Sequence, residues 1–154
     1  FEYLLEAKDL MKISDPLAEF SLDKTENDAL GQTHYRMQQI YRGLPVFGAQ
    51  VIVHADELGM VRRLNGRYYP TPGINDLTPA VSGNAARSLA LEDLSGFTRV
   101  KELSAMEKQY AVAPENEAEL CVYHKNNDPE QEVLCWKVNL IPNLLENWDY
   151  FIDA

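Results

Sequence analysis

The sequence predicts an α+β protein built from two small modules, each an antiparallel β-sheet, with a helix packed on the second sheet. Three observations support this class. Side chains alternate in character along residues 32–40, as they do in a strand. Prolines and a glycine cluster near residue 73, which is typical of a linker. Beyond that linker, apolar residues recur at helical spacing from Val81 to Leu94.

The first module is predicted to begin with a strand over the residues FEYLLEA. A loop follows, because Asp15 and Pro16 interrupt any early helix. The next strand runs from Gln32 to Ile40, and neither of its faces is purely apolar. One face carries Thr33, Tyr35, Met37 and Gln39, and the other carries His34, Arg36, Gln38 and Ile40.

Two tight turns are predicted to join this strand to its neighbours. Arg42-Gly43 suits a two-residue hairpin turn, and it precedes a β-prone stretch from Val46 to His54. Asn65-Gly66 lies between two further β-prone stretches, and Asn-Gly is the strongest short hairpin signal because both residues tolerate positive φ. Residues 32–69 are therefore predicted to form an antiparallel meander.

The linker divides the chain into modules at residues 1–72 and 73–154. After it, Thr78 suits the N-cap of a helix and Pro79 its first position, where a missing N–H costs nothing. Gly96 stands where a C-cap glycine is expected. Further strands are expected near residues 107–113, 118–125, 132–140 and 148–153.

The two cysteines are predicted to face each other across a hairpin. A turn centred on Asp128 pairs Cys121 with Cys135, and the same register pairs Glu119 with Lys137. Directly opposed residues lie within disulfide range, so a bond is expected, and it would indicate an oxidising compartment. The alternative is a pair of free, half-buried thiols.

Composition excludes several classes of partner. The chain has 24 acidic and 14 basic residues, and its net charge of −10 repels nucleic acid and anionic membrane surfaces. No apolar run approaches the roughly 20 residues that span a bilayer. The start at Phe1, without a methionine or a basic leader, favours a processed or trimmed terminus.

No catalytic or metal-binding motif is recognisable. The histidines at 34, 54 and 124 lie too far apart in sequence for a His-Glu-x-x-His zinc site. Nucleophile-elbow and nucleotide-binding glycine motifs are missing, and the loop NNDPEQE lacks the oxygen spacing of a calcium loop. We therefore expect no catalytic residue, metal or cofactor, although a carboxylate or His-Asp pair formed only by folding is left open.

The stretch THYRMQQIYRGLPVFGAQVIVH closely resembles the fungalysin/thermolysin propeptide (FTP) motif, with FSL and DALG before it and the LNG turn after it. The second half, which has a Thr-Pro helix start, the residues WKV and the ending WDYFIDA, resembles the PepSY module. In precursors of thermolysin-like zinc proteases this module follows the FTP motif. The acidic, cysteine-containing version is most similar to the vibriolysin and pseudolysin branch.

The resemblance implies a prosegment that is made in cis with a secreted or periplasmic metalloprotease, assists its folding and inhibits it until degraded. Zinc and calcium would belong to the partner catalytic domain. In the family the chain continues beyond the position of Ala154 into the catalytic cleft, which leaves direct blockade by these residues open. A free-standing secreted binding or inhibitor module and an enzyme are the alternatives.

The resemblance also implies roles for individual residues. Polar motif positions would be structural or would contact the protease: His34, Arg36, Gln39 and Tyr41. Gly43, Pro45 and Gly48 would set the shape of the backbone. Val46, Asn65 and Gly66 are further motif positions with a structural or interface role. In the last strand Trp148, Tyr150 and Asp153 are expected to bind the partner, with the two aromatic residues as anchors. The alternative is a core role, because Trp148, Tyr150 and Ile152 share one face.

Overall fold

The computed structural model describes residues 1–101, 104, 106 and 118–154. Over these residues the fold is α+β, as predicted, and the strands pair in the order β1-β2-β3-β5-β6-β7 with β4 on β3. All the pairings with a defined register are antiparallel except β3 with β5, which pair in parallel at Val46 and Val122. The elements are α1 (Glu2–Met11), α2 (Pro16–Glu19), β1 (Phe20–Asn27), β2 (Thr33–Tyr41), β3 (Leu44–Ala55), β4 (Val61–Gly66), α3 (Gly83–Ser95), β5 (Glu119–His124), η1 (Lys125–Asn127), β6 (Glu132–Asn143) and β7 (Glu146–Asp153).

The chain divides into two compact units. The first contains Phe1–Ile74 and Val122–Glu132, and the second contains Asn75–Cys121 and Val133–Ala154. The segment from Val122 to Glu132 thus belongs to the unit formed by the start of the chain. The predicted strand at residues 107–113 lies outside the described residues.

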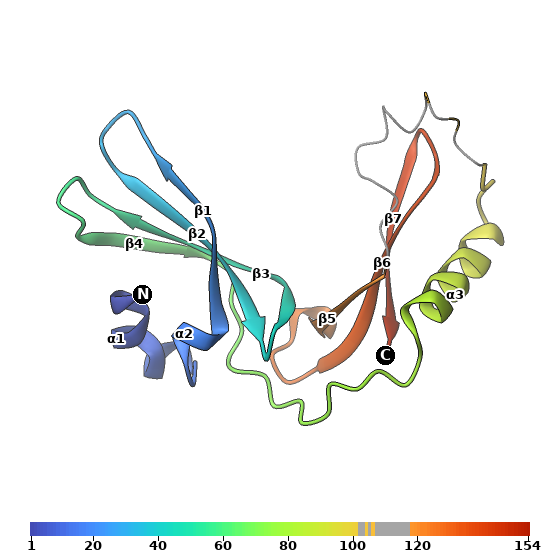
Figure 1. Cartoon of the computed structure of the whole chain (residues 1–154), viewed down its shortest axis with the longest axis horizontal. Helices are drawn as coiled ribbons and strands as arrows, with labels where there is room; N and C mark the ends of the chain where they lie inside the picture. Colours follow the sequence, from blue (N-terminus) through green and yellow to red (C-terminus); the bar gives the residue numbers. More distant parts are fainter. Residues whose placement is uncertain (102–103, 105, 107–117) are drawn as a thin grey trace. The chain divides into compact units, whose positions relative to one another are not determined.

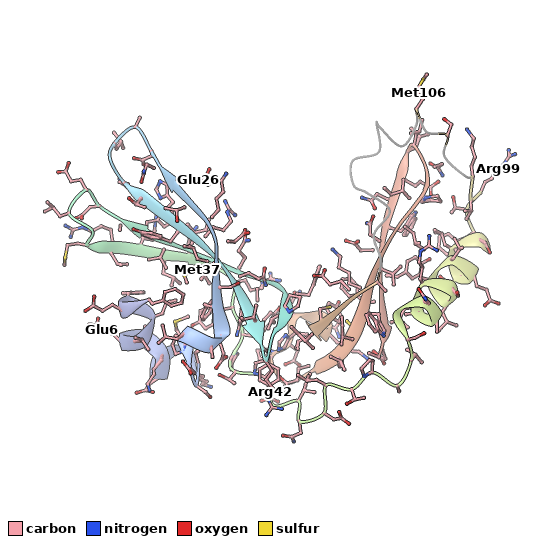
Figure 2. All side chains as sticks on the ribbon, in the orientation of Figure 1. Glu6, Glu26, Met37, Arg42, Arg99 and Met106 are labelled. Atoms are coloured by element: carbon pink, nitrogen blue, oxygen red, sulfur yellow. The ribbon has the colours of Figure 1, made fainter. Side chains whose placement is uncertain are left out.

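The prediction of a strand over FEYLLEA is wrong, because these residues begin helix α1. Leu4 and Met11 are buried seven residues apart, and Ala7 packs with them, which is the spacing of a helical face. This face lies on one side of the β1–β4 strands (Figure 1). Met37, labelled in Figure 2, belongs to the same core. The core consists of Leu4, Met11, Ile13, Phe20, Met37, Val51 and Val53.

Strand β1 is present in the structure but was not predicted from the sequence. Asp15 does not simply end a helix: its carboxylate accepts hydrogen bonds from the N–H groups of Leu17 and Ala18 and so caps the short helix α2. The chain then continues directly into β1, where Phe20 alone is buried. A strand with one buried residue has no apolar alternation, and its pattern therefore resembles a loop.

The β2–β3 hairpin is confirmed. Tyr41 pairs with Leu44, and the turn residues Arg42 and Gly43 have φ of 47° and 88°. Positive φ at both positions is the geometry of a type I′ turn, whose twist matches the flanking strands. Residues 33–66 form the antiparallel meander through β2, β3 and β4.

The prediction of a turn at Asn65-Gly66 is wrong. Both residues lie in β4, where they pair with Ile52 and Val51. The turn comes earlier, where the carboxylate of Asp56 accepts hydrogen bonds from the N–H groups of Leu58 and Met60. Gly66 is required for another reason: its φ is 120°, and a Cβ there would collide with the backbone of Gln50.

In the second unit, α3 begins later than predicted. Its N-cap is Ser82, whose hydroxyl accepts a hydrogen bond from the N–H of Ala85, whereas the Thr78 N–H donates to Asp76. Gly96 is the C-cap as predicted. In Figure 1 the helix lies beside β6 and β7. Its buried face packs on β6 through Ala86, Ala90, Leu94, Val138 and Leu140.

Candidate functional site

The polar side chains His34, Arg36 and Gln38 of β2 lie on the face of strands β1–β4 that points away from the core around α1. Met37, Val51 and Val53 face α1, so their neighbours in β2 and β3 project to the opposite side. Cross-strand pairing places His34 beside His54 and Gln38 beside Gln50. Arg36 and Ile52 also lie on this face, with Arg63 and Asn65 on the neighbouring strand β4.

The centre of this face is held by side-chain amides. Arg36 donates a hydrogen bond to Gln50 Oε1 at 2.9 Å. The Gln38 side-chain amide lies within 2.9–3.0 Å of the carbonyl oxygens of Gln39, Val46 and Ala49, next to the β-bulge where the β2–β3 register shifts. Gln38 therefore satisfies carbonyl groups that the irregular ladder leaves without partners. Sequence analysis did not single it out as a site residue.

Gln39 and Tyr41 point to the other side of β2 and bind the segment that follows β4. Gln39 is fully buried; its amide donates to the carbonyl of Tyr69 at 2.8 Å and accepts from the Tyr69 N–H at 2.9 Å. The Tyr41 hydroxyl donates to the carbonyl of Ile74 at 3.0 Å. These contacts fix the path of residues 69–74 against the sheet.

The remaining motif positions shape the β2–β3 hairpin. Gly43 completes the turn, and Pro45 pairs with Ile40 in β2. Val46 is fully buried and pairs with Val122 of β5. Gly48, with φ of 70°, lies beside the bulge that Gln38 binds.

Two histidines that are far apart in sequence meet on the polar face. The Nδ1 atoms of His34 and His54 are 2.7 Å apart. On the outer side of each ring, Nε2 of His34 lies 3.3 Å from Asp28 Oδ2, and Nε2 of His54 contacts Asn65 Oδ1. Hydrogen bonds from the Gln32 and Leu30 N–H groups, together with His34, hold the pKa of Asp28 below its usual value, so the carboxylate is ionised.

The third histidine occupies a different environment. His124 is 2% exposed and stacks on the Tyr69 ring at a centroid distance of 3.7 Å. Within the described part of the chain neither of its ring nitrogens has a hydrogen-bond partner, although Glu132 Oε2 lies 3.8 Å from Nε2. Burial lowers the pKa of His124, which favours the neutral ring.

The cysteine side chains lie together and are buried. Their sulfur atoms are 3.5 Å apart and are not joined by a disulfide, and both residues are at most 2% exposed. The hydrogen bond with Cys135 lowers the pKa of Cys121. A disulfide would require the sulfur atoms to approach to about 2.05 Å, and the bond stays a prediction.

The β7 residues have unequal exposure. Trp148 is 41% exposed, packs edge-on against Phe97 and donates to Glu146. Tyr150 packs on the α3 core and donates its hydroxyl hydrogen bond to Asp93 at 3.0 Å. Asp153 is exposed and pairs through its backbone with Cys135.

Two absences concern the described residues alone. These residues contain no group of three or more His, Cys, Asp or Glu side chains arranged to hold a metal ion. Nor does any helix in these parts of the chain have the length and apolar character needed to cross a membrane.

Comparison with known proteins identifies the motif. The Fungalysin/Thermolysin Propeptide Motif family matches residues 18–68. The whole chain aligns with 27% of the length of a thermolysin from Alicyclobacillus acidocaldarius, at 29% sequence identity. It also aligns with 26% of the length of a bacillolysin from Bacillus cereus, at 30% sequence identity. It thus spans about a quarter of the length of these relatives. The chain therefore contains a fungalysin/thermolysin propeptide motif, and over its whole length it is homologous to part of thermolysin and bacillolysin.

Proposed function

We propose that this chain is the prosegment of a secreted thermolysin-like zinc metalloprotease, which assists folding of the catalytic domain and inhibits it until the prosegment is degraded. One observation carries the proposal: the entire chain aligns with only about a quarter of thermolysin and bacillolysin, and the chain itself contains a propeptide motif. Zinc and calcium belong to the catalytic domain, and the prosegment needs no cofactor for this role.

The proposed modules are an FTP module at residues 1–72 and a PepSY-like module at 73–154. The division into two compact units supports a boundary near residue 74, with residues 122–132 joining the first unit. The vibriolysin and pseudolysin branch is the proposed subfamily. A disulfide between Cys121 and Cys135 in an oxidising secreted or periplasmic compartment belongs to the same proposal.

We assign the polar motif residues mainly to internal structure. Gln39 and Tyr41 bind the backbone of residues 69–74, and Arg36 binds Gln50, so their polar groups already have partners. A buried polar group that lost its hydrogen-bond partner would lower the free energy of unfolding by about 1–3 kcal/mol. These residues therefore contribute more by stabilising the fold than they would by contacting a partner. His34 remains partly exposed, with 25% of its side chain accessible.

On β7 we propose Trp148 as the principal anchor for the catalytic domain, with Asp153, near the end of the same strand, as a separate polar contact. Large aromatic side chains that are exposed in the free protein are frequent hot spots in interfaces. Tyr150 is the weaker candidate, because its ring packs on α3 and its hydroxyl is bound to Asp93. It would contribute mainly by supporting the strand that presents Trp148.

The test is refolding of the cognate catalytic domain in trans. Denatured catalytic domain is diluted into buffer with no prosegment, with wild-type chain, or with the Trp148→Ala or Tyr150→Ala variant. Folded domain is quantified by size-exclusion chromatography, because a bound inhibitor would suppress peptidase activity. Leu58→Ala is the matched control, since Leu58 is 81% exposed and lies in the first unit.

We expect wild-type chain and Leu58→Ala to raise the yield equally, and Trp148→Ala to raise it less. The same yield with and without wild-type chain would refute the chaperone role. A full effect from a folded Trp148→Ala variant would refute only the anchor. Inhibition is measured separately by adding the chain to mature protease, and undiminished activity at saturating chain would refute the inhibitory role.

A further inference from the structure

An open groove lies between helix α1 and the core side of strands β1–β4, within the first unit. It encloses about 670 Å³, a volume in the range of ligand-binding sites. Figure 2 labels one residue from each wall, Glu6 on α1 and Met37 on β2. The groove is therefore formed by elements that the rest of the unit already holds in place.

The groove has a buried floor and an exposed rim, and both are apolar. Four floor residues are at most 6% exposed: Leu4, Met37, Val53 and Ala55. Five rim residues are 36–59% exposed: Phe1, Tyr3, Leu22, Tyr35 and Met60. Large apolar side chains that are exposed around one depression are typical of an interaction site on a soluble protein.

Two carboxylates are the charged side chains among the described lining residues. Glu2 and Glu6 are exposed, lie one helical turn apart on α1, and have no ion-pair partner in the described part of the chain. Like charges at this spacing repel each other. The helix dipole favours a carboxylate in the first turn, where Glu2 lies, but its effect fades before Glu6. A cation beside this wall would relieve the repulsion.

We propose that the groove binds a segment of a partner protein in which large apolar side chains are flanked by lysine or arginine. The apolar side chains would cover the floor and the rim, and the basic side chains would pair with Glu2 and Glu6. Because the rim is open to solvent, a chain that crosses the groove fits it better than a small molecule that must be enclosed. The net charge of −10 also attracts a basic segment.

This inference goes beyond the proposed prosegment role and does not depend on it. The anchor proposed for the catalytic domain, Trp148, belongs to β7 in the second unit, whereas the described lining residues of the groove belong to the first. A substitution at one surface leaves the other unchanged, so the two proposals can fail separately.

The test is titration of the full chain with the acetylated and amidated peptide GKLFKG, followed by nuclear magnetic resonance of isotope-labelled methionine methyl groups. Met37 and Met60 line the groove, so their resonances should shift saturably. Met11 lies in the same core but not in the groove, and Met106 lies in the second unit, so their resonances should stay in place. The peptides GELFEG and GKAAKG should bind more weakly, because each lacks one half of the proposed recognition.

A first pair of variants tests the charges. The double variant Glu2→Gln/Glu6→Gln should weaken GKLFKG binding roughly fivefold, through the loss of two exposed ion pairs. Glu92→Gln/Glu130→Gln removes two exposed carboxylates outside the groove and should bind as wild type does. The methionine spectrum shows in each case that the variant is folded.

A second pair tests the apolar rim. Leu22→Thr removes apolar area but keeps a residue suited to strand β1, and it should also weaken binding. Leu30→Thr is the matched control, since Leu30 is 77% exposed and lies outside the groove. The proposal would be overturned if wild-type Met37 and Met60 showed no saturable shift. Equal binding of GKLFKG and GELFEG, or undiminished affinity in either groove variant, would also overturn it.

Discussion

Individual polar side chains decide how the first unit is held together. Gln39 is the clearest example, because it is fully buried and replaces a missing strand partner for Tyr69 through two hydrogen bonds. His124 is the opposite case, a buried ring whose nitrogens have no hydrogen-bond partner among the described residues. Gln39 supplies hydrogen-bond partners to backbone groups, whereas His124 makes the free energy of unfolding depend on pH.

Gln39→Leu should lower the free energy of unfolding by about 2–4 kcal/mol, because it leaves the buried N–H and carbonyl of Tyr69 without partners. Urea denaturation measures the loss. The matched control is Gln131→Leu, which removes an exposed amide that binds Asp128 and should change stability by less than about 0.5 kcal/mol. Equal effects of the two substitutions would show that the buried hydrogen bonds are not the cause.

His124 should make the wild-type protein less stable as pH falls below about 6.5, the ordinary pKa of histidine in an unfolded chain. The folded pKa is lowered by burial, so at pH values between the two pKa values the unfolded state binds more protons and is stabilised relative to the folded state. His124→Phe keeps a ring on Tyr69 and removes this titration. Its free energy of unfolding, from urea denaturation, should therefore fall less between pH 7 and pH 5.5.

Carboxylates with lowered pKa values, such as Asp28 and Asp56, lose their stabilising contribution only at lower pH and do so in both proteins. His34 and His54 are also common to both, so the difference between the two proteins isolates His124. Parallel pH profiles for wild type and His124→Phe would contradict the assignment.

At the scale of elements, the hairpin of β5 and β6 brings the two cysteines together. Both thiols are buried and their sulfur atoms are 3.5 Å apart, so a disulfide would need these atoms to approach to about 2.05 Å. The bond would close a loop between residues 14 apart in sequence. Such a link stabilises mainly by restricting the unfolded chain.

Oxidised protein should therefore lack two hydrogen masses in intact mass spectrometry, and it should be about 3 kcal/mol more stable to urea than the reduced form. The Cys121→Ser/Cys135→Ser double variant, measured with and without reductant, controls for effects of the reductant elsewhere. A mass that stays fully reduced after treatment with oxidised glutathione would rule out the disulfide.

For the whole molecule, the main features are two compact units and a homologous match that covers about a quarter of thermolysin. A segment that works by presenting a preformed surface needs stable units more than it needs reactive groups, because binding the native partner lowers that partner's free energy by mass action. In the proposed role, the buried polar contacts of the first unit and the helix packing of the second would supply this stability. The refolding experiment with Trp148→Ala tests it directly.

The sequence by itself determined those features that depend on neighbours in the chain. Positive φ at Arg42-Gly43 produced the predicted hairpin, and the alternation of β2 showed which residues share a face. The apolar spacing predicted that residues in this region form helix α3, although Ser82 rather than Thr78 caps it, because both hydroxyl residues satisfy the same local rule. The propeptide motif could also be recognised from the sequence, because it is a continuous stretch of the chain.

Only the tertiary structure decided features that depend on distant partners. FEYLLEA is short and mixed in character, and its helix follows from packing of Leu4 and Met11 on the sheet. Asn65-Gly66 has the local preference of a turn, but Gly66 is needed because the backbone of Gln50 approaches it too closely for a Cβ. The pairing of His34 with His54 depends on strand register, and twenty residues of sequence separation conceal it. Local propensities amount to about 1 kcal/mol or less per residue, whereas burying a large side chain contributes about 1.5–3 kcal/mol, and packing therefore prevails where the two disagree.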